Sequence, residues 1–266
     1  MSVEPARLLE IAVSVTRGAA DLARQMRAEG VTGIATKSTA TDVVTAADQA
    51  TERYVRETLG QVRPGDAVLG EEAGESAGAG TVRWIVDPID GTVNYLYGIP
   101  HYAVSLAAEV DGVVVAGVVR NAATGEEWTA TVGGGAWRDG VRLSGSEVTR
   151  LGQALIATGF GYASDRRVHQ ARVVAALLPR VRDIRRLGVA SLDLCFAAEG
   201  RVDGYYEKGL NLWDHAAGGL IAAEAGLRVG GLAGAPVGPE LLVAAPEGIW
   251  AALHDTLLDL DAAGGP

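Results

Sequence analysis

The sequence contains few of the residues that mark several common classes of protein. There is one cysteine in 266 residues, Cys195, so the chain cannot form an internal disulfide, and a reducing cytoplasm is the expected compartment. Aromatic residues make up 5% of the chain, and its five tryptophans are not interleaved with basic residues as on many nucleic-acid-binding surfaces. No apolar run approaches the roughly 18 residues of a membrane-spanning helix. The sequence therefore indicates neither a nucleic-acid-binding protein nor a membrane protein.

Positive charge is also scarce. The chain has 23 Lys and Arg residues against 33 Asp and Glu residues, which gives a formal net charge of -10. Such a surplus of negative charge disfavours nucleic-acid backbones and anionic membranes as partners. It suits a protein that gathers cations, although many ordinary soluble enzymes are equally acidic. Because 48% of the residues are hydrophobic, the chain can bury a sizeable core and is predicted to fold.

Several well-known catalytic motifs are absent. The sequence has no GxxxxGK followed by Ser or Thr, no HExxH pair and no GxSxG elbow. The stretch DPIDG does not match an EF-hand loop, because its two acids stand three positions apart instead of two. These absences argue against a P-loop, a catalytic zinc site, a serine nucleophile elbow and a calcium-binding loop.

The first half of the chain predicts helices followed by strands. Apolar residues recur at helical spacing through 1–30 with charged residues between them, which predicts an amphipathic helix and not a signal peptide. A second helix is predicted to follow TDVVTAAD (41–48) and to stop near Gly60. Short strands are predicted within 63–74 and at 84–86. Between 101 and 143, turn signals separate β-branched stretches, and this pattern indicates an antiparallel meander.

After about Gly145, helices and strands alternate. The pattern predicts strands near 181–187, 202–207 and 241–245, a C-terminal helix, and helices at 169–178, 191–199 and 214–225. Such alternation is typical of a layered α/β arrangement. We therefore predict one domain, 1–266, in which an α+β half (1–146) joins an α/β half (147–266).

The segment WIVDPIDGTVNY (84–95) places two aspartates around a rigid turn. Asp87 ends a short apolar strand, and Pro88 cannot donate to a ladder, so strand pairing is predicted to stop there. The turn can aim Asp87, the Ile89 carbonyl and Asp90 at one point, and such oxygen ligands suit Mg²⁺. Taken alone, however, the segment is explained by a strand, a β-turn and a helix cap.

The residues that follow this turn favour an anion. Gly91 permits a close backbone approach or a positive φ. Thr92 opens the next predicted helix, whose free N–H groups attract negative charge. The segment therefore combines candidate metal ligands with a candidate phosphate site.

Other acidic segments have ordinary explanations when each is read alone. Glu71 and Glu72 in LGEEAG fit a solvated surface turn. Asp214 in NLWDHAAGG fits a helix N-cap, and Asp42 and Asp48 in TDVVTAAD fit helix-capping chemistry. Their joint occurrence with the segment 84–95 favours a metal site built from acids that are far apart in the chain.

In these motifs the sequence resembles the inositol monophosphatase family of Mg²⁺-dependent, lithium-sensitive phosphatases. The matching segments, in the family's order and spacing, are DVVTAAD (42–48), GEE (70–72), WIVDPIDGTVNY (84–95) and NLWDHAAGGLIAAEAG (211–226). RPGDAVLGEEAG and TGFGY bring the chain nearest to the bacterial members, particularly those of actinobacteria. The resemblance implies a layered α-β-α-β-α sandwich, a homodimer, and hydrolysis of a small phosphorylated substrate, foremost myo-inositol 1-phosphate.

The resemblance assigns the acids to metal sites. It implies that Glu71, Asp87 and the Ile89 carbonyl hold one Mg²⁺ ion. A second ion would be held by Asp87, Asp90 and Asp214, with Asp87 bridging the two. A third, weaker ion would lie near Glu71. The resemblance therefore implies two to three Mg²⁺ ions per subunit, at the place where the two halves meet.

The resemblance also implies catalytic and substrate-binding residues. Thr92, paired with Asp48, would orient the attacking water beside Glu71. The amides of Gly91 and Thr92 would receive the phosphate, and Glu207 in YYEKG would contact the inositol hydroxyls. The remaining implied positions are substrate contacts at Asp90 and Asp214, a backbone contact to the sugar ring at Gly188, Val189 and Ala190, and supporting roles for Lys37 and Asp42.

Two alternatives stay open at this point. Val189 stands where many relatives have Ser or Thr, and the substrate could instead be histidinol phosphate, fructose 1,6-bisphosphate or 3′-phosphoadenosine 5′-phosphate. A hypothesis of a different class is a regulatory binding protein that keeps the fold without catalysis. The presence of all the expected acids weighs against that second alternative.

Overall fold

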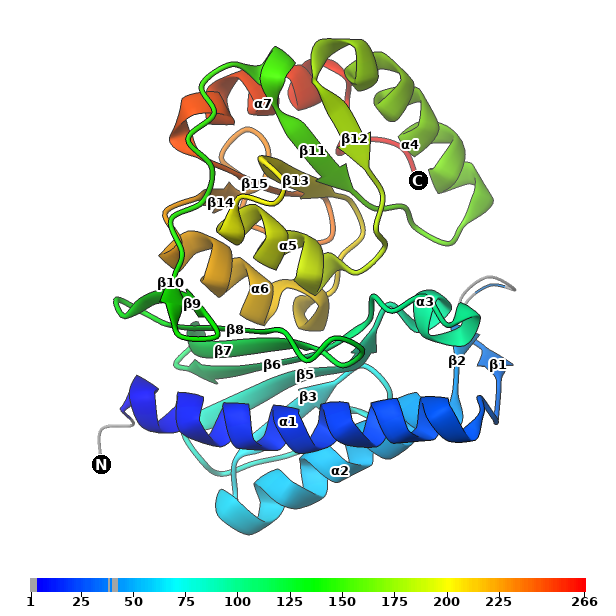
Figure 1. Cartoon of the computed structure of the whole chain (residues 1–266), viewed down its shortest axis with the longest axis vertical. Coiled ribbons are helices and arrows are strands. Elements are labelled where there is room, and N and C mark those ends of the chain that lie inside the picture. Colours follow the sequence, from blue (N-terminus) through cyan, green and yellow to red (C-terminus); the bar gives the residue numbers. More distant parts are fainter. Residues whose placement is uncertain (1–3, 38, 40–42) are drawn as a thin grey trace.

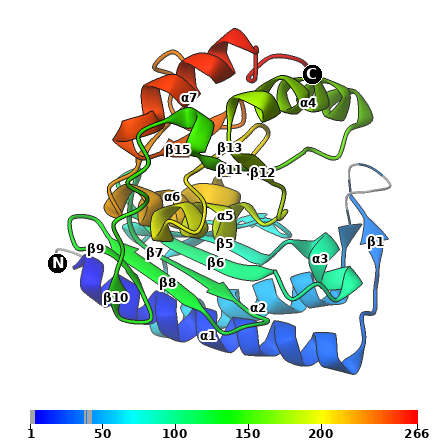
Figure 2. The ribbon, with the colours of Figure 1, turned by 45° about the horizontal axis from the view of Figure 1, so that its top comes forward.

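The chain folds into alternating layers of helix and sheet. The computed structural model describes residues 4–37, 39 and 43–266. Figure 1 and Figure 2 show the layers in the order α1 and α2, an eight-stranded sheet, α5 and α6, a five-stranded sheet, and α4 with α7. This order confirms the predicted α-β-α-β-α sandwich. No helix in the described part of the chain combines the length and the apolar character needed to cross a membrane.

The first outer layer consists of α1 (Pro5–Glu29) and α2 (Ala46–Val62). Pro5 begins α1, a position where its fixed φ suits a helix and its missing N–H costs nothing. Leu8, Ala12, Val15 and Ala19 recur at three- and four-residue spacing and are buried against the sheet. The predicted amphipathic helix is therefore confirmed, while α2 continues two residues beyond the expected stop at Gly60.

The eight-stranded sheet contains the predicted meander. Its strand order is β10-β9-β8-β7-β6-β5-β3-β4, and β5 to β10 pair antiparallel in sequence order. The strands are β3 (Ala67–Gly70), β4 (Gly74–Glu75), β5 (Val82–Asp90), β6 (Ala103–Val110), β7 (Val113–Asn121), β8 (Glu127–Thr131), β9 (Gly135–Arg138) and β10 (Val141–Arg142). A separate pair, β1 (Ala35–Thr36) and β2 (Val43–Val44), lies outside this sheet.

The prediction that pairing stops at Pro88 was wrong. Strand β5 continues to Asp90, because a one-residue bulge carries the chain past the proline. Asp87 pairs with Ser105 and Asp90 with Ala103, so three steps on β5 match two on β6. The bulge is what allows both aspartates to remain on a paired, rigid strand.

The five-stranded sheet mixes parallel and antiparallel pairs. Its order is β12-β11-β13-β15-β14, in which β11 pairs parallel with β12 and β13, and β15 pairs antiparallel with β13 and β14. The strands are β11 (Leu155–Thr158), β12 (Asp183–Arg185), β13 (Gly204–Glu207), β14 (Arg228–Gly230) and β15 (Leu242–Ala245). The helices after the first sheet are α3 (Thr92–Tyr97), α4 (Ser164–Leu177), α5 (Ala190–Glu199), α6 (Leu212–Glu224) and α7 (Glu247–Asp259), with short 3₁₀ turns at Leu151–Gln153 and Leu178–Arg180.

Several boundaries in this half differ from prediction. Helix α4 begins at Ser164, five residues before the expected start, because its first two turns are polar and carry no apolar period. Helix α6 begins at Leu212, with Asn211 and not Asp214 as the N-cap, and it ends at Glu224 instead of residue 225. The short strands β11 and β14 were not predicted.

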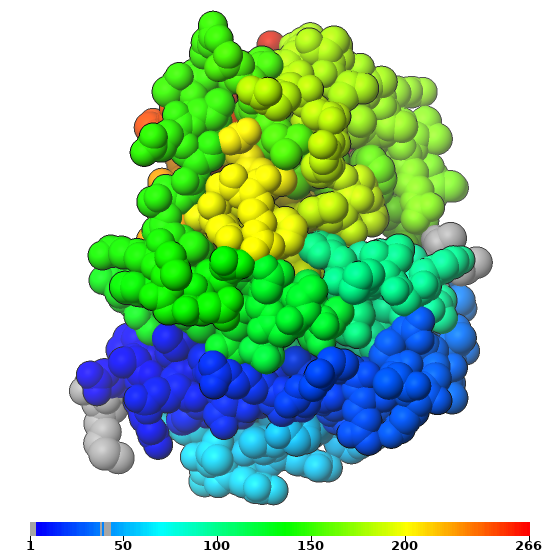
Figure 3. Space-filling view, viewed as in Figure 1, coloured from blue at the N-terminus to red at the C-terminus, as the bar shows by residue number. Residues whose placement is uncertain are grey.

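Small residues bring the central helices close to each other and to both sheets. A Cβ added to Gly218 of α6 would lie 3.0 Å from the Cβ of Leu194 of α5. A Cβ added to Gly117 of β7 would lie 3.0 Å from the Cα of Ala217. The central core therefore has little room for larger side chains. Figure 3 shows one face of the molecule, on which the yellow part of the chain near residue 200 lies directly above the green part.

Candidate active site

The acids of the central motifs follow two neighbouring strands. Strands β3 and β5 pair parallel, with Gly70 opposite Val86, so Glu71 and Asp87 come next on adjacent strands. Glu71 lies within hydrogen-bonding reach of Asp87. The parallel register therefore explains why two acids separated by 16 positions in the sequence meet in space.

Asp87 is a buried carboxylate with several acidic neighbours. Its side chain is 2% exposed, and its Oδ1 accepts a hydrogen bond of 3.1 Å from the Ile89 N–H. Burial raises the pKa of Asp87 well above its usual value, and the charges of Glu71, Asp90 and Asp214 raise it further. These carboxylates therefore act on one another as like charges in a single cluster.

Asp90 and Asp214 connect this cluster to the central helices. The Ser191 N–H, in the first turn of α5, donates to Oδ2 of Asp90 at 2.7 Å. Burial raises the pKa of Asp90 to about 6, against the lowering effect of the neighbouring Ser191. Asp214 is the third residue of α6, where its Oδ2 accepts from the Asn211 N–H at 2.6 Å. Burial also raises the pKa of Asp214, and Asp90 adds to the effect.

Lys37 provides positive charge at the edge of the cluster. Its Nζ lies 2.9 Å from Oε1 of Glu71 and 2.6 Å from Oε1 of Glu72. Burial alone would lower the pKa of Lys37, but the two carboxylates outweigh it and raise the pKa above its usual value. The loop that carries both glutamates is held by Glu52 of α2, which accepts hydrogen bonds from the N–H groups of Glu72 and Ala73.

Thr92 and Asp48 form a hydrogen-bonded pair. The Thr92 hydroxyl lies 3.1 Å from Oδ1 of Asp48 and 3.1 Å from the Ile89 carbonyl oxygen. Oδ2 of Asp48 is occupied by the N–H and the hydroxyl of Thr45, at 2.8 and 2.6 Å. Burial raises the pKa of Asp48, while the bonds from Thr45 lower it. The capping box at the start of α2 thus fixes the carboxylate that faces Thr92.

A cavity of about 600 Å³ opens over this cluster. Asp48 is not among its lining residues, and Asp42 lies outside the described part of the chain. The lining contains most of the residues assigned from sequence: Lys37, Glu71, Asp87, Ile89, Asp90, Gly91, Thr92, Gly188, Ala190, Glu207 and Asp214.

Val189 forms a support behind the cavity wall. Its side chain is fully buried, and it is absent from the cavity lining although Gly188 and Ala190 on either side are present. Gly91 has φ 91°, and a Cβ built there would lie 2.6 Å from Cγ2 of Val189. Glycine at position 91 therefore satisfies both a left-handed backbone and close contact with Val189.

Glu207, the last residue of strand β13, also lines the cavity. The Tyr205 hydroxyl donates to its Oε2 at 2.6 Å. Burial raises the pKa of Glu207 to about 7, although the bond from Tyr205 and the charge of Arg186 lower it. A Cβ on Gly159 would lie 1.8 Å from Oε2 of Glu207, so this glycine leaves the space that the carboxylate occupies.

The donor set fits a hard divalent cation in its chemistry. Among the described residues, no three His, Cys, Asp or Glu side chains form a ready-made ion site. However, Glu71, Asp87, Asp90 and Asp214 line one cavity. Burial raises the pKa of all four, and repulsion from other acids of this set raises the pKa of Asp87, Asp90 and Asp214 further. Oxygen donors that repel one another are what a cation such as Mg²⁺ stabilises.

The whole chain was compared with known protein families. A model described as the inositol monophosphatase family matches residues 4–262. The chain belongs to the inositol monophosphatase family. This finding confirms the resemblance based on the segments around Glu71, Asp87 and Asp214.

Several named relatives match most of the chain. An inositol-1-monophosphatase of Mycobacterium leprae is 48% identical over 270 residues, covering 94% of this chain and 93% of the relative. The structure of Mycobacterium tuberculosis SuhB has a TM-score of 0.83 and 43% identity, covering 98% of this chain and 99% of that one. The Nus factor SuhB of Escherichia coli is 38% identical over 221 residues, covering 82% of this chain and 83% of the relative.

Sequence reasoning missed several residues of this inositol monophosphatase family site. Ser191 contacts Asp90 through its backbone N–H, and Glu52 holds the loop that carries Glu71 and Glu72. Neither residue belongs to a distinctive motif. Asp193 is fully buried in α5, and neither carboxylate oxygen has a hydrogen-bond partner among the described residues. Its signal was an acid inside the otherwise apolar stretch SLDLCFAA. Arg186 lines the cavity and lowers the pKa of both Asp193 and Glu207.

Proposed function

We propose that the protein hydrolyses a small phosphate monoester, foremost myo-inositol 1-phosphate to myo-inositol and phosphate, with Mg²⁺ as cofactor. The observation that carries the proposal is the gathering of Glu71, Asp87, Asp90 and Asp214 in one cavity beside the Thr92–Asp48 pair. Membership in the inositol monophosphatase family supports the reaction class. The mycobacterial relatives named inositol-1-monophosphatase support the substrate.

The proposed metal ligands divide into two groups. Glu71, Asp87 and the Ile89 carbonyl would hold one ion; Asp87, Asp90 and Asp214 would hold a second, and a weaker third would lie near Glu71. When bound, such ions lower the pKa of water and offset negative charge on both sides of an in-line displacement at phosphorus. Lys37 is placed to keep Glu71 ionised, because its ammonium lies 2.9 Å from that carboxylate.

The Thr92–Asp48 pair would orient the attacking water. The hydroxyl proton of Thr92 points to Oδ1 of Asp48 or to the Ile89 carbonyl, both at 3.1 Å, which leaves the oxygen free to accept a hydrogen bond from water. Asp48 has a pKa raised by burial, so it is a better proton acceptor than an exposed aspartate. Glu71, on the other side of the cluster, would complete the catalytic set.

The substrate would span the cavity from the acids to β13. Its phosphate would lie on the amides of Gly91 and Thr92, where the left-handed glycine allows a close approach. Asp90 and Asp214 would face the ester oxygen. At the far side, the Glu207 carboxylate would accept hydrogen bonds from ring hydroxyls beside the Gly188–Ala190 backbone.

The experiment is phosphate release from purified protein with Mg²⁺. The substrates are myo-inositol 1-phosphate, histidinol phosphate, fructose 1,6-bisphosphate and 3′-phosphoadenosine 5′-phosphate, each compared with the Asp90→Asn variant. We expect release that requires Mg²⁺, is fastest with inositol phosphate and is lost in the variant. A clear preference for another ester overturns the substrate, and equal release by wild type and variant overturns the site.

A regulatory binding role is the second candidate. It is favoured by the 38% identity to the Escherichia coli Nus factor SuhB. In that case a partner would bind the wild type and the Asp90→Asn variant equally, while neither released phosphate. Retention of the acids, which a pure binding role does not need, is the reason for placing it second.

Assembly, inhibition and compartment remain predictions carried by family resemblance. We expect a homodimer, which sedimentation analysis tests at micromolar concentration, and inhibition by Li⁺. We also expect a division into halves at 146/147 and a cytoplasmic location, where the single cysteine would stay reduced.

A further inference from the structure

Lys208 is a buried cation beside the candidate substrate site. It is 8% exposed and directly follows Glu207 at the end of β13. Its Nζ donates to the carbonyl oxygens of Ala263, Gly264 and Gly265 at 2.7, 2.8 and 2.9 Å. All three ammonium protons therefore have acceptors, and all the acceptors are main-chain oxygens from a segment more than 50 positions away.

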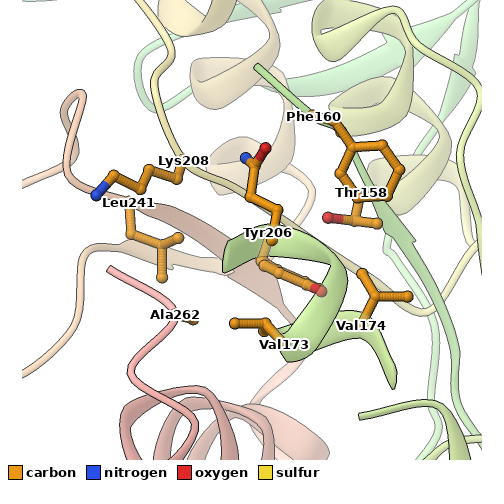
Figure 4. Close-up of a pocket in the computed structure, with 10 residues that line it drawn as sticks. Thr158, Phe160, Val173, Val174, Tyr206, Lys208, Leu241 and Ala262 are labelled. Carbon is orange, nitrogen blue, oxygen red and sulfur yellow. The ribbon is translucent and has the colours of Figure 1, made fainter. Parts of the chain in front are cut away.

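Strand geometry separates the roles of Glu207 and Lys208. Side chains alternate along a strand, so Tyr205 and Glu207 share one face of β13 while Tyr206 lies on the other, and Lys208 follows just after the strand. Tyr205 packs in the central core, and Tyr206 packs in the outer core with α4 and α7. Figure 4 shows Lys208 and Tyr206 at a water-sized cavity that both line together with Ala262, and Lys208 also lines the large cavity.

The residues 261–266, which we call the strap, have a sequence that suits this contact. Gly265 has φ 75°, and a Cβ there would lie 2.6 Å from the ring of His169. A Cβ on Gly264 would lie 2.1 Å from the carboxylate of Asp261. The two glycines therefore allow the strap to curl so that three successive carbonyls face one ammonium.

The strap is also tied to helix α4. Nε2 of His169 lies 2.8 Å from the Asp261 carbonyl oxygen, and the Arg166 Nε–H donates to the main-chain oxygen of Pro266 at 3.1 Å. Arg166, like Lys208, lines the large cavity. The strap thus connects Lys208, at the end of β13, to Arg166 and His169 of α4.

We propose that Lys208 is a positioning residue: its bond to the strap fixes the end of β13 and so directs Glu207 into the cavity. Because the strap carbonyls take up all three donors of its ammonium, Lys208 acts through Glu207 and not on the reacting atoms. Its effect falls on substrate binding, because Glu207 is proposed to contact the substrate and is not one of the proposed metal ligands. The kinetic part of this inference rests on the proposed function.

The first test is the kinetics of Lys208→Met, which keeps the length of the side chain and removes the charge and donors. We expect KM for inositol 1-phosphate to rise about tenfold, because a small displacement of a binding group is costly. We expect kcat to stay within about twofold, since the acid cluster is untouched. Lys208→Arg, which keeps the charge, should recover part of the KM. Arg172→Met, which removes an exposed cation from α4, is the matched control and should change neither constant.

The second test removes the acceptors in place of the donor. A chain lacking residues 263–266 should show the same rise in KM as Lys208→Met. Combining the deletion with Lys208→Met should give no rise beyond that of the deletion alone, because the deletion already breaks the contact of Lys208 with the strap. A chain lacking only Pro266 measures the separate effect of losing the oxygen that accepts from Arg166. Additive effects on KM would mean that the strap and the lysine act separately, and the proposal would be wrong.

Hydrogen exchange distinguishes this proposal from the proposed function. Amides of residues 205–211 should exchange faster in Lys208→Met and in the deletion than in wild type or Arg172→Met. If wild type releases no phosphate from any ester, the proposed function fails. Hydrogen exchange alone then tests whether the contact of Lys208 with the strap fixes the end of β13. Unchanged exchange there, or a lowered Tm with KM within about twofold of wild type, would show that Lys208 only stabilises the fold.

Discussion

The acid cluster and Lys208 both carry buried charge, but their charged groups have opposite surroundings. Glu71, Asp87, Asp90 and Asp214 share one cavity, and the pKa of Asp87 is raised by burial and by its acidic neighbours. The Lys208 ammonium instead has three carbonyl acceptors within 2.9 Å. Charge left in mutual repulsion is costly to the fold, so its retention points to a ligand. Charge that is fully satisfied points to positioning.

Asp90→Asn should give the largest effect and test the first half of this comparison. We expect phosphate release to fall by roughly 10²–10³-fold, because a charge that faces the reacting phosphate is lost. Without divalent ions, the same variant should have a higher Tm than wild type, since one repelling carboxylate is removed.

The control for that variant is Asp259→Asn on the exposed face of α7. It should leave both phosphate release and Tm close to wild type. A lower metal-free Tm for Asp90→Asn would show that the cluster stabilises the fold, and the contrast with Lys208 would fail.

Thr92→Ala should lower kcat by about 10²-fold, because the attacking water would lose its orienting hydroxyl. Steady-state kinetics with Mg²⁺ measure this, and KM should change much less than kcat. Asp48→Asn should behave similarly, and the double variant should be no worse than the poorer single one. Independent, multiplying losses would mean that the two residues do not act as a pair.

Gly91→Ala should destabilise the protein by about 1–3 kcal/mol, through a left-handed backbone and a clash with Val189. Adding Val189→Ala should recover part of the stability, since it removes Cγ2 and leaves only the backbone strain. Urea unfolding measures all three chains. Failure of the second change to help would show that the clash with Val189 is not what destabilises Gly91→Ala.

Glu207 gives the smallest effect, which depends on pH. Burial raises its pKa from 4.5 to about 7, so the folded state holds a proton that the unfolded state releases. Its contribution to stability is present below pH 4.5 and is lost as pH rises through about 7. Metal-free wild type should therefore lose more stability between pH 5 and pH 8 than Glu207→Gln does, as measured by urea unfolding. Equal losses would place Glu207 in a more solvated setting.

Prediction from sequence succeeded where chemistry repeats along the chain. The convergence of Glu71 and Asp87 was implied by the family resemblance of their motifs, and the meander followed from its turn signals. Pairing beyond Pro88 was not predicted, because proline normally ends strand pairing and a bulge depends on the partner strand. Asn211 was missed as the N-cap because Asp214 is an equally good candidate by type. Contacts such as Ser191 with Asp90, or Lys208 with 263–265, depend on packing over long separations and leave no local pattern.

The most direct test of the account is the amount of Mg²⁺ held at equilibrium by the intact chain. Equilibrium dialysis should compare wild type with a variant that combines Asp87→Asn, Asp90→Asn and Asp214→Asn, using Asp259→Asn as control. We expect two to three Mg²⁺ ions per chain on wild type and on the control, and essentially none on the triple variant. Equal Mg²⁺ on wild type and the triple variant would contradict it.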